Sequence, residues 1–132
     1  MTTEGIEDAY LVEGNVSGDT LQFIQRSLLN IIQSFNGSNP KSVVVLDNAS
    51  IHHVDAVIDM ITPTGALVRF LPPYSPDLNP IEEVFSQVKS YIRDNEIIYQ
   101  TTKEPRLIIA SAFASITTQD CQNYIKHAGY IE

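Results

Sequence analysis

The feature that most restricts the fold of this chain is the run VVVLD, in which four aliphatic residues, Val43–Leu46, end directly on Asp47. An unbroken apolar run of this length predicts a central strand that is apolar on both faces and covered by helices. Ligands bind at the carboxyl ends of the strands in an open α/β sheet. The carboxylate at the end of this strand is therefore a candidate functional group.

The segments around this strand alternate between extended and helical patterns. Residues 7–14 and 66–71 have extended character and are predicted to be strands. Elsewhere, apolar residues recur at intervals of three and four, which predicts helices. The predicted helices cover residues 17–36, 54–61, 80–92, 104–116 and 118–128. This order of elements indicates an α/β layered fold with a sheet that is at least partly parallel, and no domain boundary is visible.

Composition and charge exclude several classes of function. The chain has 16 acidic and 8 basic residues and a net charge of −8, so it carries no overall basic footprint for nucleic acid. A single cysteine, Cys121, excludes an internal disulfide and a cysteine-based zinc site, and is expected to be a small buried residue. No apolar run approaches the roughly 18–20 residues that span a bilayer, so no membrane partner is expected.

Two carboxylates are candidates for a shared metal ion. Asp47 follows the first buried strand, and Glu82 begins the helix that follows the next strand, so both can reach the same edge of the sheet. Magnesium prefers hard oxygen ligands, usually one or two carboxylates with waters and substrate phosphates. The residue types therefore suit a magnesium site.

Simpler explanations exist for each of these residues. Asn79 and Glu82 have the spacing of a capping box, in which Asn79 would be the N-cap. The Asp47-Asn48 pair is also typical of a turn after a strand. His52 or His53 could cap or pack against the following helix.

Two longer stretches together resemble a known family. VVVLDNASIHH (residues 43–53) and LPPYSPDLNPIEEVFSQVKSYI (residues 71–92) resemble the DDE transposases of the mariner superfamily and related bacterial insertion-sequence transposases. In that family the second catalytic Asp opens a D-N-A-x-x-H stretch, and the last acid lies in S-P-D-L-N-P-I-E. Residues 48–81 separate Asp47 from Glu82, and this spacing of 34 residues is the one found in one branch of that superfamily, so the resemblance selects Glu82 over Glu83.

The resemblance implies a ribonuclease H-like fold, a mixed sheet flanked by helices. It also implies that Asp47 and Glu82 are catalytic acids that bind Mg²⁺, with Mn²⁺ as a substitute. Asn48 and His52 match polar positions that support the metal or the substrate phosphate, and Asn79 matches a position that fixes the approach to the helix. A further position implied to lie in the core is occupied by Phe85, where many members have Trp.

The family's first catalytic Asp has no counterpart in a suitable strand among the residues before Asp47. Residues 1–132 are therefore expected to be a partial catalytic domain that lacks the first strand or strands and does not cleave DNA by itself. The missing strands predict an exposed sheet edge or face, and hence either association, for example into a homo-oligomer, or marginal stability. The family's upstream helix-turn-helix region is also absent, so weak or no DNA binding is expected of these residues alone.

For the complete protein, the resemblance implies metal-dependent DNA cleavage and strand transfer in cut-and-paste transposition, with transposon ends and target DNA as partners. Its location would be nuclear in a eukaryote and cytoplasmic otherwise. One alternative is a truncated or domesticated segment that serves as a non-catalytic protein-interaction module. Another is a generic acidic α/β domain in which Glu82 only caps a helix.

Overall fold

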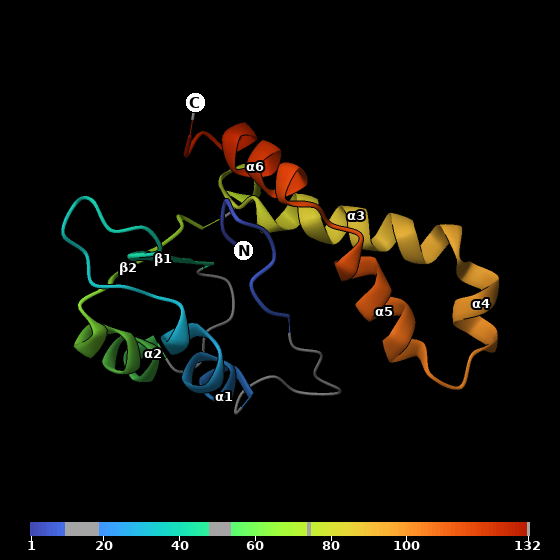
Figure 1. The fold of residues 1–132 in the computed structure, drawn as a ribbon, viewed down its shortest axis with the longest axis horizontal. Helices are drawn as coiled ribbons and strands as arrows, with labels where there is room; N and C mark the ends of the chain where they lie inside the picture. Colours follow the sequence, from blue (N-terminus) through green and yellow to red (C-terminus); the bar gives the residue numbers. More distant parts are fainter. Residues whose placement is uncertain (10–18, 48–53, 74, 132) are drawn as a thin grey trace. The chain divides into compact units, whose positions relative to one another are not determined.

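The computed structural model describes residues 1–9, 19–47, 54–73 and 75–131, which Figure 1 shows in colour. The chain divides into two compact units. Unit 1 consists of Met1–Leu11 and Pro76–Glu132, and unit 2 consists of Val12–Ser75. Each unit has a hydrophobic core of its own. Within the described ranges, no helix combines the length and the apolar character that crossing a bilayer requires.

Unit 2 is built around a parallel pair of strands, β1 (Val43–Leu46) and β2 (Leu67–Phe70). The register places Val43 opposite Leu67 and Leu46 opposite Phe70. The connection contains α2 (Val54–Ile61) and a short 3₁₀ helix, η2 (Thr62–Thr64). Parallel strands need such a crossover, so the predicted strand, helix and strand order and the parallel pairing are confirmed.

The core of unit 2 lies on one face of this sheet. Figure 1 shows α1 (Asp19–Arg26) and α2 on the same side of the two strands. The buried residues come from both helices, from β1 and from the start of the second strand segment: Ile24, Val44, Val57, Ile61 and Ala66. The prediction that β1 is buried on both faces is wrong, because Val43 and Val45 remain 44% and 41% exposed. This exposure does agree with the other prediction, that a domain without its first strands has an exposed sheet edge or face.

The first helix is shorter than its apolar pattern predicted. It ends at Arg26 and is followed by a 3₁₀ turn, η1 (Leu28–Asn30), rather than continuing to residue 36. Leu28 and Ile32 still pack against the core of unit 2, which explains why the apolar spacing persists beyond the helix. The backbone instead bonds to neighbouring segments, as in the bond from Gln33 N to the carbonyl of Lys41 at 2.9 Å.

The strand predicted over residues 7–14 is not found in its described part. Residues 7–9 have no regular secondary structure, and the remaining positions lie outside the described residues.

Unit 1 contains four helices in its described residues: α3 (Ile81–Asp94), α4 (Glu96–Thr101), α5 (Pro105–Ala114) and α6 (Thr118–His127), preceded by the 3₁₀ helix η3 (Pro76–Leu78). The helices predicted at residues 80–92, 104–116 and 118–128 are confirmed to within two residues. Only α4 was missed. Its Ile97 is 80% exposed and Ile98 54% exposed, so α4 has no buried apolar stripe that a sequence pattern could reveal.

The core of unit 1 joins three of these helices. It contains Val84 and Val88 of α3, Ala112 of α5, Cys121 of α6, and Ile116 from the link between α5 and α6. Cys121 has no solvent exposure, which confirms that it is a small buried residue, and this burial raises the pKa of its thiol.

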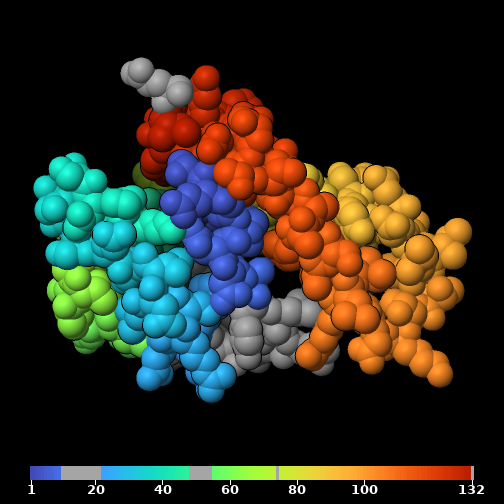
Figure 2. Space-filling view, in the orientation of Figure 1, coloured from blue at the N-terminus to red at the C-terminus, as the bar shows by residue number. Residues whose placement is uncertain are grey.

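The first residues of the chain lie along α6. Two hydrogen bonds hold them there, from Gln122 Nε2 to the carbonyl of Thr3 (3.1 Å) and from Thr118 Oγ1 to the carbonyl of Glu4 (2.9 Å). Figure 2 shows residues 1–9, in blue, against α6. Met1 and Ile6 add apolar contacts to the core of unit 1, so the N-terminal segment is part of this unit despite its distance in sequence.

We expect Gly65→Ala to destabilise the protein by about 1–3 kcal/mol more than Gly37→Ala. Both glycines have nearly the same left-handed backbone, with φ of +84° and +83°. A Cβ at position 65 would lie 2.9 Å from Ser34 Cβ, whereas one at position 37 would meet nothing within 4 Å. Urea unfolding of both variants isolates this steric cost. The cost should shrink in the double variant Gly65→Ala/Ser34→Gly, and equal losses at the two glycines would contradict the contact.

The pH dependence of stability should reveal the capping box at the start of α6. Thr117 Oγ1 accepts from Asp120 N, and Asp120 Oδ2 accepts from Thr117 N, both at 3.0 Å. The Thr117 backbone bond and a bond from Gln87 lower the pKa of Asp120. Because the pKa is lower in the folded state, the stabilisation is complete above pH about 4 and is lost as the pH falls through the folded value.

The measurement compares unfolding of the wild-type protein with Asp120→Asn between pH 2 and pH 7. The stability difference should be constant at the upper end and should shrink below pH about 4. A difference that stays constant down to pH 2 would show that the carboxylate charge has no part in the cap.

Candidate functional site

Asp47 lies at the carboxyl end of β1, as the sequence predicted. It directly follows Leu46, the last residue of the strand, and its side chain is exposed. The pairing with the second strand continues to this point, because Leu71 N donates to the carbonyl of Leu46 at 2.9 Å. A carboxylate at this position is held by a hydrogen-bonded strand and faces solvent. Two further predicted site residues, Asn48 and His52, lie outside the described residues.

Glu82 is the second residue of α3, and its side chain is exposed. The segment before it is held by a short series of hydrogen bonds around Asn79. Asn79 N donates to the carbonyl of Pro76 (3.1 Å), and Glu82 N donates to the carbonyl of Asn79 (3.1 Å). Ile81 N makes a long bond to Asn79 Oδ1 (3.4 Å). These bonds satisfy N–H groups at the start of α3, which lack partners within the helix.

The capping-box explanation of Glu82 is wrong. The N-cap of α3 is Pro80, which offers no side-chain bond, and the carboxylate of Glu82 has no hydrogen-bond or ion-pair partner in the described part of the chain. The helix that was predicted to begin at Pro80 begins one residue later, at Ile81. The exposed carboxylate is not explained by helix capping.

The neighbouring acid has a different environment. Glu83 Oε1 lies 2.7 Å from Nδ1 of His127 at the end of α6. The spacing in the sequence already selected Glu82 over Glu83, and the structure distinguishes the same two residues by their contacts. Of the two adjacent carboxylates, Glu83 is paired within unit 1 and Glu82 is directed to solvent.

Helical geometry explains why Glu82 faces outward. Adjacent residues are 100° apart, so Glu82 and the fully buried Val84 lie on opposite sides of α3. Phe85 and Lys89, three and seven residues further on, share the side of Glu82, and both are exposed. The expectation that Phe85 occupies a core position is wrong, since it is 41% exposed. Lys89 was not selected from the sequence, although its seven-residue spacing from Glu82 places it on this face.

The two candidate acids belong to different units. Asp47 lies in unit 2 and Glu82 in unit 1, and each is positioned by the core of its own unit. Within the residues that the structure describes, no group of three or more His, Cys, Asp or Glu side chains could hold a metal ion. The convergence of Asp47 and Glu82 on a shared metal thus stays a prediction from the sequence.

Comparison with known proteins identifies one family. Residues 1–104 match the family model described as DDE superfamily endonuclease, a range that includes both candidate acids. Among curated proteins and among solved structures, the comparisons found no significant match to this chain.

The stability of Glu82→Ala should separate a functional acid from a structural one. The loss of the helix-dipole interaction, about 0.3–1 kcal/mol, is partly offset by the helix propensity of alanine, so we expect a net change within about 0.5 kcal/mol. Thr117→Ala is the matched control, because it removes a hydrogen-bonded cap and should cost about 0.5–2 kcal/mol. Urea unfolding measures both. A loss at Glu82 as large as that at Thr117 would mean that Glu82 has a structural partner.

Proposed function

Because the chain belongs to the DDE superfamily endonucleases, we propose that it forms part of the catalytic domain of a transposase. The proposed reaction is cleavage of a DNA strand followed by transfer of the freed 3′ end to target DNA, with a divalent metal ion as cofactor. The proposed relatives are the transposases of the mariner superfamily and the bacterial insertion-sequence transposases. The proposed fold of the complete domain is ribonuclease H-like.

The observation that carries this proposal is the contrast between Glu82 and Glu83. Glu83 has a partner in His127, whose Nδ1 lies 2.7 Å from its carboxylate. Glu82 has none among the described residues, yet a series of backbone bonds through Asn79 fixes the turn that carries it. A precisely held acid that faces solvent is suited to bind a ligand.

The donor atoms fit a divalent ion of the magnesium type. Asp47 and Glu82 are exposed carboxylates, and hard oxygen donors are the ligands that Mg²⁺ and Mn²⁺ prefer. We assign both acids as metal ligands, with Asn79 holding the turn before Glu82 and with Asn48 and His52 supporting the metal or the substrate phosphate. A bound divalent ion supplies Lewis acidity, which lowers the pKa of water and neutralises phosphate charge.

The side of α3 that carries Glu82 also suits contact with a DNA strand. Lys89 is exposed two turns after Glu82 and can pair with a phosphate, and Phe85 between them offers an exposed aromatic ring. A phosphate contact of this kind positions the strand without reading its sequence. The net charge of −8 means that DNA affinity must come from local contacts or from other regions of the full-length protein.

A non-catalytic protein-interaction module is the second candidate. Its support is the exposed apolar surface of unit 1, where Ile97 of α4 and Leu107 of α5 are 80% and 64% exposed. Such residues are common where proteins associate. This candidate makes no use of Glu82 and predicts no metal binding there.

Manganese titration followed by NMR tests the catalytic proposal. Paramagnetic broadening should centre on Asp47 and Glu82, and Glu82→Gln should weaken the affinity at least about tenfold, since even indirect supports of metal ligands contribute that much. Glu83→Gln is the matched control: it makes the same change one residue away, and its amide can still hydrogen-bond to His127, so it should keep the broadening.

Two results would contradict the catalytic proposal. One is equal weakening of manganese binding by Glu82→Gln and Glu83→Gln. The other is broadening centred away from both Asp47 and Glu82, which would direct attention to the interaction module.

A further inference from the structure

The segment that carries Glu82 is held by the end of the chain at three places. We call residues 78–87 the acid-bearing segment, since it runs from the end of η3 into the first half of α3. Its contacts are with α6 and with the residue that follows the C-terminal turn of α6. These C-terminal contact residues all lie beyond position 104, outside the range that matches the family model.

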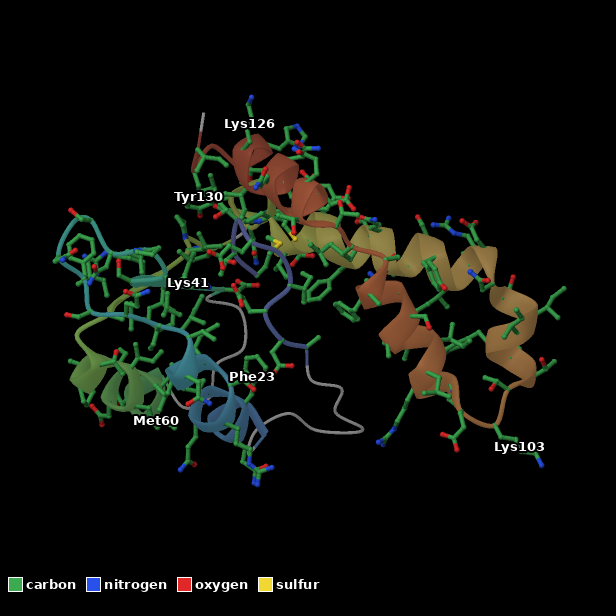
Figure 3. The ribbon with its side chains drawn as sticks, in the orientation of Figure 1. Phe23, Lys41, Met60, Lys103, Lys126 and Tyr130 are labelled. Atoms are coloured by element: carbon green, nitrogen blue, oxygen red, sulfur yellow. The ribbon has the colours of Figure 1, made fainter. Side chains whose placement is uncertain are left out.

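The first contact is at the turn before α3. Tyr130 donates its hydroxyl to the carbonyl of Leu78 at 2.7 Å. Leu78 directly precedes Asn79, which accepts the backbone N–H of Glu82. Gly129, with φ of +91°, turns the chain at the end of α6 so that Tyr130 reaches back. Figure 3 shows Tyr130 on the side of the segment before α3, whereas Lys126 points away from it.

The second and third contacts lie between α3 and α6, and on each helix the polar residues involved lie along one side. Glu83 and Gln87 are four residues apart and lie on one side of α3. Glu83 meets His127, and Gln87 donates to Asp120 Oδ2 (3.2 Å) and accepts from the hydroxyl of Tyr124. The three partners on α6 are spaced by four and three residues, which also places them on one side of their helix. Rotation of α3 about its axis would break these contacts.

The placement of the contacts points to orientation rather than overall stability. The side chains of His127 and Glu83 are 78% and 40% exposed, and an ion pair with that exposure contributes little to stability. Beyond Gln87, the side-chain hydrogen bonds of α3 recorded among the described residues stay close to the helix, as in the bond from Arg93 to Ser90. The contacts with α6 are thus concentrated around Glu82.

We propose that Tyr130 and His127 are positioning residues for Glu82: they hold the acid-bearing segment so that the carboxylate has a fixed direction. The proposal rests on the proposed role of Glu82 as a metal ligand. It assigns the C-terminal residues a role in assembling the site without contact between them and the metal or the DNA.

The test uses Tyr130→Phe and His127→Ala, singly and together, in the full chain. The first readout is amide hydrogen exchange at Asn79 and Glu82, and the second is manganese broadening at Glu82. In the double variant we expect exchange at these amides to become about tenfold faster and the manganese affinity to fall about tenfold, as expected for loss of local hydrogen bonds. The unfolding midpoint should match that of the control.

Two further variants make the test specific. Tyr99→Phe is the control, because it removes a hydroxyl from α4 that has no hydrogen-bond partner among the described residues. His127→Gln can still donate to Glu83, so it should restore much of what His127→Ala loses.

The outcomes separate this proposal from the proposed function. If the wild-type protein does not bind manganese at Glu82, the metal role fails, and hydrogen exchange alone decides whether the segment is positioned. Exchange at Asn79 and Glu82 that equals the control would overturn the positioning role. A parallel rise at Val88 together with a lower unfolding midpoint would also overturn it, because the contacts would then stabilise α3 as a whole.

Discussion

The packing of α3 against α5 and α6 is the interaction on which the candidate site in unit 1 depends. Val84 and Val88 enter a core with Ala112 and Cys121, and this burial determines which side of α3 faces solvent. Glu82 lies opposite Val84 on the helix, so the same contact that stabilises the unit directs the carboxylate outward. The acid needs no partner of its own to be held in place.

The polar contacts beside this core fix the orientation of the segment around Glu82 more closely than apolar packing alone does. Apolar contacts are non-directional, whereas a hydrogen bond restricts both distance and angle. The bonds from Tyr130 to the carbonyl of Leu78 and between Gln87 and α6 therefore restrict the segment around Glu82 more narrowly than the core does. A metal ligand benefits from such restriction, since the distance from its oxygen to the ion must stay within a few tenths of an ångström of the preferred value.

Much of the local structure was predictable because each pattern had a local cause. The apolar run of β1 and the spacing of apolar residues in α2 and α3 each reflect interactions within a few residues. The failures share a different origin. The exposed second face of β1, the short α1 and the exposure of Phe85 depend on which segments pack nearby, and helix α4 has no buried stripe to signal it.

For the candidate site, the sequence by itself determined the identity of the acids, their spacing and the family to which residues 1–104 belong. These properties can be read from the order of residues in the chain and need no knowledge of distant contacts. Only the tertiary structure decided that Glu83 pairs with His127 and that Tyr130 reaches the carbonyl of Leu78. It also decided that Glu82 takes no part in capping α3. The physical reason is separation in the sequence. Glu83 and His127 lie 44 positions apart, Leu78 and Tyr130 lie 52 positions apart, and only folding brings each pair together.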